Sequence, residues 1–151
     1  MRPDKFPLPD LAATKSLAKI VAKRLKIGDV VALSGDLGTG KTAFARALLR
    51  EFGVEGDAPS PTFTLVQTYE TRGFLVSHVD LYRLKSADEL DELGWDDVLA
   101  EGVALVEWPE RAKGRLPENR LTLRFLLAED GARICLIEKN GSWNERLKTL
   151  P

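Results

Sequence analysis

The stretch that decides the fold is Gly35-Asp36-Leu37-Gly38-Thr39-Gly40-Lys41-Thr42, which matches the pattern G-x-x-x-x-G-K-[ST] at every fixed position. Its glycines let the backbone curl, so that successive N–H groups point inward at phosphate oxygens. The ammonium of Lys41 suits the β- and γ-phosphates of a nucleotide, and the hydroxyl of Thr42 is a hard oxygen ligand for Mg²⁺. We therefore expect the whole stretch to bind Mg-ATP as a phosphate-binding loop (P-loop), with Lys41 also serving catalysis.

The segments on either side of this loop fit the same interpretation. Val30–Leu33 is a continuous apolar run, typical of a strand that is buried on both faces. Lys41–Phe52 carries apolar residues at helical spacing, and Gly53 stands where such a helix would end. A helix that begins at the loop directs its partial positive charge at the same anion. Because strand, glycine-rich loop and helix follow in this order, an accidental match to the pattern is a poor explanation.

The rest of the chain reads as short strands and helices. Asp10 is predicted to cap a first helix, and Phe63–Glu70 and Phe74–Asp80 are predicted to form an antiparallel hairpin. A second buried run ends at Glu107. Two later strands and two short helices with capping boxes complete the set, at Leu121–Leu127, Arg133–Glu138, Ser86-x-x-Glu89 and Ser142-x-x-Glu145. The sequence thus predicts an α/β fold of the P-loop NTPase type, with a mixed sheet flanked by helices.

Length and composition restrict the class of protein. A chain of 151 residues fits one domain, residues 1–151, and 44% hydrophobic with 30% charged residues is an ordinary globular composition. The net charge of −1, from 22 basic and 23 acidic residues, argues against a general polyanion-binding surface. The single cysteine, Cys135, excludes an internal disulfide and lies in an apolar run. Since neither a signal peptide nor a run of membrane-spanning length is found, we expect a cytoplasmic protein.

Two carboxylates follow predicted strands and are candidates to complete the site. The motif His78-x-Asp80-x-Tyr82 closes the second strand of the hairpin, and Glu107-Trp108-Pro109-Glu110 closes the later buried run. A carboxylate at a strand end beside a P-loop can hold the Mg²⁺ shell or orient the attacking water. The hydroxyl-bearing segment Ser60–Thr64 stands where GTPases place a switch that senses the γ-phosphate. Taken singly, each feature is weak evidence, because strand-end carboxylates are usually solvated and aromatic residues are usually packed.

Taken together, these motifs resemble one family. The chain carries Gly-Asp-Leu-Gly-x-Gly-Lys-Thr, then Ser-Pro-Thr-Phe-Thr-Leu-Val from Ser60, His-x-Asp-Leu-Tyr-Arg-Leu from His78, and Glu-Trp-Pro-Glu from Glu107. In order and spacing these are similar to the TsaE family, bacterial ATPases of tRNA threonylcarbamoyladenosine biosynthesis. The resemblance covers most of the chain, from Asp10 to Leu127.

The resemblance implies roles for residues and a set of partners. Thr42 and Glu107 would hold Mg²⁺, Asp80 would position or activate water, and Trp108 would lie near the nucleotide or the partner surface. TsaE proteins work with the TsaB–TsaD pair, in which TsaD transfers the threonylcarbamoyl group to an adenosine beside the tRNA anticodon. ATP hydrolysis would reset that complex rather than drive the transfer. We therefore expect TsaB–TsaD as partner, tRNA contact only through that complex, and no membrane partner.

Three other functions remain open at this point. A small-molecule P-loop kinase would share the loop, and a possible basic lid for one is formed by Arg111, Lys113 and Arg115. A GTPase would explain the D-x-x-G match at Asp91–Gly94, but this match falls in a predicted helix and no Asn-Lys-x-Asp follows it. A binding protein with an inactive loop is disfavoured because the loop and both carboxylates are intact. ATP turnover without an added acceptor separates the ATPase from the kinase.

Overall fold

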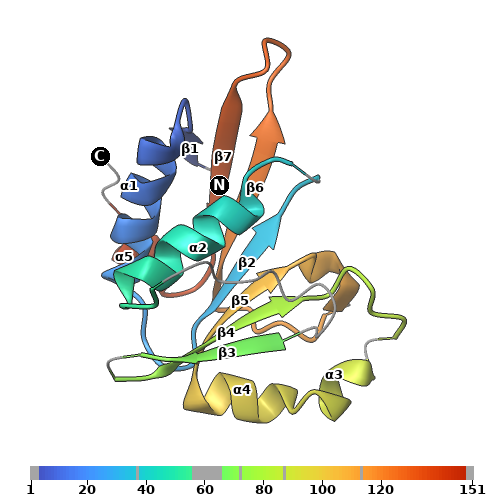
Figure 1. Cartoon of the computed structure of the whole chain (residues 1–151). Coiled ribbons are helices and arrows are strands. Elements are labelled where there is room, and N and C mark those ends of the chain that lie inside the picture. The colour runs from blue at the N-terminus through green and yellow to red at the C-terminus, as the bar shows by residue number, and fades with distance from the viewer. Residues whose placement is uncertain are drawn as a thin grey trace.

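A computed structural model of the chain describes residues 4–36, 38–55, 66–71, 73–86, 88–112 and 114–148, and Figure 1 shows its course. Strands and helices are mixed along the chain, as expected for an α/β protein. In chain order they are β1 (Asp4–Pro7), α1 (Leu11–Ala22), β2 (Val30–Ser34), α2 (Lys41–Glu51), β3 (Val66–Glu70), β4 (Leu75–Asp80), α3 (Glu89–Glu92), α4 (Trp95–Glu101), β5 (Gly102–Glu107), η1 (Pro109–Ala112), β6 (Arg120–Leu127), β7 (Arg133–Lys139) and α5 (Trp143–Arg146).

The strands form one seven-stranded mixed sheet in the order β1-β7-β6-β2-β5-β4-β3. The four strands β6, β2, β5 and β4 are parallel neighbours. Antiparallel strands flank them, with β7 and β1 beside β6 and with β3 beside β4. The loop that leaves β2 therefore opens near the middle of the edge at which the parallel strands end together. The predicted mixed sheet with an antiparallel hairpin is confirmed.

Helices cover the two faces of the sheet unequally (Figure 1). On one face, the α1–α2 face, these two helices pack side by side, and with Trp143 of α5 they enclose a core over β2, β5, β6 and β7. On the other, the α3–α4 face, a smaller core lies over β4 and β5 and includes Val79, Val106 and Trp95. No described helix is both long enough and apolar enough to cross a membrane.

Local sequence signals explain the elements next to the P-loop. Asp10 caps α1, because its Oδ1 accepts the backbone N–H of Ala13 at 2.9 Å. Val30–Leu33 is an unbroken apolar run because β2 has parallel neighbours on both sides and is buried on both faces. The alternation of buried residues along β6 places Leu121, Leu123 and Phe125 in the core of the α1–α2 face.

Three elements were not predicted, namely β1, α4 and η1. β1 has only four residues and depends on pairing with the edge of β7, a contact that no local pattern encodes. α4 follows at once after Gly94, whose left-handed backbone (φ 71°) separates it from α3. This glycine therefore separates two short helices where the sequence predicts one.

Neither predicted capping box forms. The hydroxyl of Ser86 accepts the backbone N–H of Asp88 at 3.3 Å, rather than that of Glu89 three residues along. The hydroxyl of Ser142 accepts from the guanidinium of Arg146 instead of from the backbone. Both helices are only four residues long.

A buried ion pair ties the C-terminal segment to the start of β2. The guanidinium of Arg146 donates to both carboxylate oxygens of Asp29, to Oδ1 at 2.9 Å, and the backbone N–H of Lys26 also donates to this carboxylate. Arg24 Nε donates in return to the carbonyl oxygen of Arg146 at 2.6 Å. The Asp29 and Arg146 side chains are only 4% and 13% exposed. These contacts hold α5 against the segment that joins α1 to β2.

Candidate nucleotide site

The P-loop, Gly35–Thr42, leaves β2 and enters α2 at Lys41. Gly35 has a φ of 137°, and a Cβ placed there would clash with the backbone carbonyl oxygen of Phe125 on β6. Only glycine fits this position, because it combines a positive φ with close backbone contact. Within the loop, the Thr39 hydroxyl donates to the carbonyl oxygen of Asp36 at 2.6 Å. The loop is thus held in a fixed curve between β2, β6 and α2.

Lys41 is buried at the start of α2 and points into the loop. Its Nζ donates to the carbonyl oxygen of Gly35 at 2.6 Å and lies 3.8 Å from the centroid of the Trp108 ring. Burial lowers the pKa of Lys41, and the nearby negative charges that oppose this shift are those of Glu107, Glu110, Asp80 and Asp36. Among the described residues, no carboxylate forms an ion pair with this ammonium. A poorly solvated cation of this kind is suited to receive an anionic oxygen.

The two predicted carboxylates lie side by side. Asp80 ends β4 and Glu107 ends β5, and the two residues are partners in the parallel register. Both are buried, with 6% and 4% of their surface exposed. Oδ1 of Asp80 accepts the backbone N–H of Tyr82 at 2.9 Å, which fixes the direction of that carboxylate. The structure therefore brings Lys41, Asp80 and Glu107 to one end of the parallel strands.

His78 holds the Glu107 carboxylate in place. Its Nε2 lies 2.6 Å from Oε2 of Glu107, and because a carboxylate only accepts, the proton is on Nε2 and the imidazole donates. This bond leaves Oε1 of Glu107 available for a further ligand. In the sequence, His78 stands only as the first residue of the motif that closes the hairpin, and no pattern assigns it a partner. Its spacing of two from Asp80, which places both on one face of β4, is the signal that could have found it.

Trp108 borders the loop in an unusual backbone conformation. Its φ of 58° is left-handed, and no other described non-glycine residue has a positive φ. A bulky residue there is strained unless its surroundings hold it. The indole lies against Lys41 on one side and against Tyr82 on another, with the Tyr82 and Trp108 ring centroids 4.9 Å apart. The guanidinium of Arg111 lies 6.0 Å from the Tyr82 ring. Trp108 therefore lies beside the P-loop lysine.

A cavity of about 580 Å³ adjoins the P-loop on the side away from Asp80 and Glu107. One wall comes from the end of the loop and the first turn of α2, at Thr39, Gly40 and Ala43. The others come from the start of α1 and the turn between β6 and β7, including Asp10, Ala132 and Arg133. Sequence reasoning missed this cavity because its walls come from three distant segments. Its position next to a phosphate-binding loop and its size suit a nucleoside.

The donor set next to the loop fits Mg²⁺ bound together with a nucleotide. Among the described residues, no group of three or more His, Cys, Asp and Glu side chains could hold a metal ion by itself. Mg²⁺ needs no such group, because it commonly takes one or two protein ligands and completes its shell with phosphate oxygens and water. The free Glu107 oxygen and the half-buried Thr42 at the start of α2 offer hard oxygen donors of this kind.

Some predicted residues fall elsewhere or lie outside the described residues. Leu37, Ser60–Thr64 and Lys113 lie outside them. Arg115 is not part of a free basic lid, because it donates to Asp88 and Asp91, each at 3.0 Å. The D-x-x-G match at Asp91–Gly94 lies in α3 and the turn after it rather than at a strand end.

The fold and the loop together define an α/β protein of the P-loop NTPase type. Comparison with known families then identifies which one. The model described as "Threonylcarbamoyl adenosine biosynthesis protein TsaE" matches residues 8–138. The chain belongs to the TsaE family, a family of threonylcarbamoyladenosine biosynthesis proteins, and the resemblance drawn from the motifs is confirmed.

Individual relatives support the same family assignment. The chain is 43% identical over 130 residues to the TsaE protein of Rickettsia felis, covering 85% of this chain and 76% of the relative. It is 39% identical over 121 residues to that of Bacillus subtilis, covering 80% and 75%. Among solved structures, the crystal structure of Bacillus subtilis YdiB matches with a TM-score of 0.80 and 30% identity, covering 97% of this chain and 93% of that one. This structural match confirms the predicted fold class.

Proposed function

We propose that the protein is a Mg²⁺-dependent ATPase that acts in the threonylcarbamoyladenosine modification of tRNA, together with TsaB and TsaD. The observation that carries this proposal is the meeting of Lys41, Asp80 and Glu107 at one end of the parallel strands, in a chain of the TsaE family. A buried cation without a carboxylate partner among the described residues, together with two buried carboxylates, supplies the kinds of group that phosphoryl transfer to water uses.

Each residue has a separate task in the proposed reaction. Lys41 exchanges its bond to the Gly35 carbonyl for the β- and γ-phosphate oxygens, where it stabilises developing negative charge. Thr42 and Glu107 would hold Mg²⁺, which would supply positive charge to neutralise the phosphates. His78 keeps the Glu107 carboxylate oriented. Asp80 orients the attacking water, since the Tyr82 N–H already fixes its carboxylate.

The nucleoside part of ATP occupies the cavity between the P-loop, the start of α1 and the β6–β7 turn. This direction is favoured because β6 and β7 lie on one side of β2, and the carboxylate-bearing β5 and β4 lie on the other. A nucleotide bound in this way places its phosphates over the loop and its γ-phosphate near Asp80 and Glu107. Since no Asn-Lys-x-Asp motif reads guanine, ATP is used in preference to GTP.

The partner step follows from the phosphate chemistry. Contacts to a γ-phosphate can order a neighbouring segment, and hydrolysis removes them. The segment proposed for this task is Ser60–Thr64, so affinity for the TsaB–TsaD pair differs between ATP and ADP, and hydrolysis resets the complex. The protein reaches tRNA only through this pair. A tenfold difference in affinity corresponds to about 1.4 kcal/mol.

The test combines two measurements on the purified protein. We expect ATP turnover that needs Mg²⁺ but no added phosphate acceptor, and unequal affinity for purified TsaB–TsaD in a non-hydrolysable ATP analogue and in ADP. Turnover that appears only with an added small-molecule acceptor would instead support a kinase. The kinase is the weaker alternative, because Arg115, one of the three residues considered for its basic lid, forms ion pairs with Asp88 and Asp91.

A further inference from the structure

One half of the α3–α4 face has no helix of the described part of the chain over it. Over β4 and β5 this face is covered by α3 and α4, but over β6 and β7 no described helix packs on it. We call this part the open face. β6 and β7 pair antiparallel, and such strands commonly leave one face to solvent, so the case for a docking site rests on what this surface is made of. By register its outward side chains are Arg120, Thr122, Arg124, Leu126, Ile134, Leu136 and Glu138.

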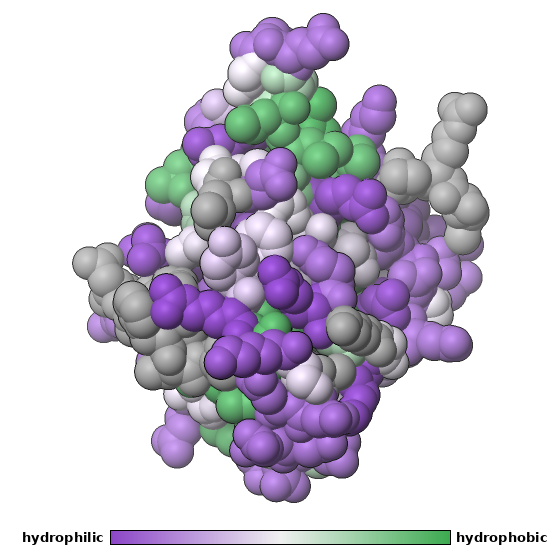
Figure 2. All heavy atoms as spheres, turned by 90° about the vertical axis from the view of Figure 1, so that its right-hand side faces the viewer, coloured by the Kyte–Doolittle hydropathy of each residue, from purple (hydrophilic) through white to green (hydrophobic). Residues whose placement is uncertain are grey.

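The end of the open face near the β6–β7 turn is apolar. Leu126 is 39% exposed, while Ile134 and Leu136 are half-buried. Leu126 is the cross-strand partner of Ile134, and Leu136 is the next outward residue of β7, so the three side chains are neighbours. Figure 2 shows an apolar area just below the polar tip of the β6–β7 hairpin. Contiguous apolar surface of this kind marks an interaction site more often than a solvated face.

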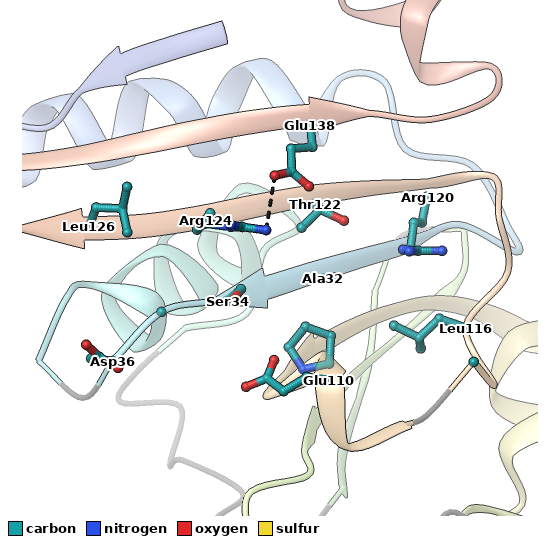
Figure 3. A pocket seen from close by; sticks show the side chains of 13 residues that line it. Ala32, Ser34, Asp36, Glu110, Leu116, Arg120, Thr122, Arg124, Leu126 and Glu138 are labelled. Carbon is teal, nitrogen blue, oxygen red and sulfur yellow. Dashed lines mark ion pairs between the residues drawn. The ribbon is translucent and has the colours of Figure 1, made fainter. Parts of the chain in front are cut away.

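A groove of about 610 Å³ continues from this apolar end between β6 and η1 (Figure 3). Its charges are separated along its length. Arg124 is neutralised by Glu138 at 3.1 Å, whereas Arg120 at the far end forms no ion pair with a described residue and donates only to the carbonyl oxygen of Pro117. Glu110 lines the opposite wall. The groove therefore offers an apolar end, a positive end and a negative wall.

These features fit an amphipathic helix. From Arg120 to Leu126 the strand spans roughly 20 Å, which corresponds to about 13 residues of helix. An apolar stripe would cover Leu126, Ile134 and Leu136, an acidic residue would meet Arg120, and a basic residue would face Glu110. The other half of the same sheet face already binds its own helices in this way.

The groove also reaches the nucleotide site. Gly35 and Asp36 of the P-loop line it, and Glu110 follows Glu107 by three residues. A helix docked here would contact both the loop and the segment that leaves the candidate metal ligand. Its affinity would depend on which nucleotide is bound, because both segments surround the phosphates.

Building on the proposed function, we propose that the open face and its groove dock an amphipathic helix of the TsaB–TsaD pair. The test measures affinity for purified TsaB–TsaD in the presence of a non-hydrolysable ATP analogue. We expect Leu126→Asp to weaken binding at least 30-fold and Arg120→Glu about 5- to 10-fold. The matched control is Ile27→Asp, an apolar residue that is 58% exposed in the turn between α1 and β2 and should leave affinity unchanged.

Binding of a fluorescent ATP analogue and the melting temperature are measured for every variant, and both should match the wild type. Equal partner affinities for Leu126→Asp, Arg120→Glu and Ile27→Asp would overturn the docking surface while leaving the proposed function intact. If the wild type does not bind TsaB–TsaD at all, the partner assignment and the docking surface both fall, but nucleotide binding still tests the ATPase. A wild-type dimer that Leu126→Asp converts to monomer would assign the groove to a second copy and overturn the proposal.

Discussion

Two buried charged clusters lie beyond opposite ends of β2, and they are built in opposite ways. At the start of the strand, Asp29 and Arg146 form a bidentate ion pair, and the backbone N–H of Lys26 donates a further hydrogen bond to the Asp29 carboxylate. At its end, Lys41 lies among carboxylates without an ion pair to any described one, and burial lowers its pKa. The charged atoms of Asp29 and Arg146 are already bound to each other and to the backbone, so they are not available to a ligand. The ammonium of Lys41 has no such partner among the described carboxylates and is available to an anion. The first cluster is therefore expected to stabilise the fold and the second to perform chemistry.

The largest expected change in stability comes from breaking the Asp29–Arg146 ion pair. Arg146→Ala leaves the Asp29 carboxylate buried without its counter-ion, so the free energy of unfolding should fall by about 3–5 kcal/mol. Chemical denaturation measures this loss, and ATP turnover per folded molecule should stay the same. The control is Arg115→Ala, whose partners Asp88 and Asp91 are exposed and whose loss should cost at most about 1 kcal/mol. Equal losses for the two variants would remove the contrast between a buried and an exposed pair.

Removing Lys41, which has no carboxylate partner among the described residues, should impair turnover and leave stability nearly unchanged. Lys41→Ala should lower ATP turnover by about 10²- to 10³-fold, because the charge that meets the phosphates is lost. The free energy of unfolding should be unchanged or slightly higher, since a buried ammonium is costly to the folded state. Steady-state turnover and chemical denaturation test both parts, with Lys19→Ala on the exposed side of α1 as control. Turnover like that of the wild type would rule out the assigned loop.

Substitutions on the carboxylate side of the site should have two kinds of effect, one on the Mg²⁺ concentration needed for binding and one on the rate of turnover. Thr42→Ala and Glu107→Ala should raise the Mg²⁺ concentration needed for nucleotide binding, and His78→Ala should do so by about 10-fold because it acts through Glu107. Asp80→Ala should mainly slow turnover. Titrations of Mg²⁺ against binding and against turnover separate the classes. Normal turnover in the Asp80 variant would exclude this residue from the chemistry.

Cys135 shows a third way to bury an ionisable group, which is to keep it neutral. Burial raises the pKa of its thiol from 9.0 to about 12. Above pH 9 the unfolded chain loses this proton first, so stability should fall as pH rises, by about 1.4 kcal/mol at pH 10. Below pH 9 the thiol should contribute no pH dependence. Unfolding at pH 8 and pH 10 under reducing conditions tests this, because Cys135→Ala should lack that part of the decline. An equal decline in both proteins would contradict the assignment.

The difference between the clusters also explains what the sequence could predict. The P-loop, its strand and its helix are consecutive, so one local pattern contains them all. Asp80 and Glu107 were found because both end apolar runs, and parallel strands end at the same edge. Asp29 and Arg146 are 117 residues apart, and neither belongs to a motif. The cavity beside the loop and the strand β1 depend in the same way on contacts between distant segments.

Because Lys41 lies over Trp108, binding of a nucleotide to the loop should alter the fluorescence of this indole. An ammonium 3.8 Å from an indole ring changes the electric field that the excited ring experiences. The other two tryptophans, Trp95 and Trp143, are buried in the cores of opposite sheet faces and give a constant background. When Lys41 leaves the ring for a phosphate, the emission of Trp108 should change while theirs does not. If the proposed function holds, Trp108 would serve as a built-in fluorescent reporter of nucleotide binding that needs no added label.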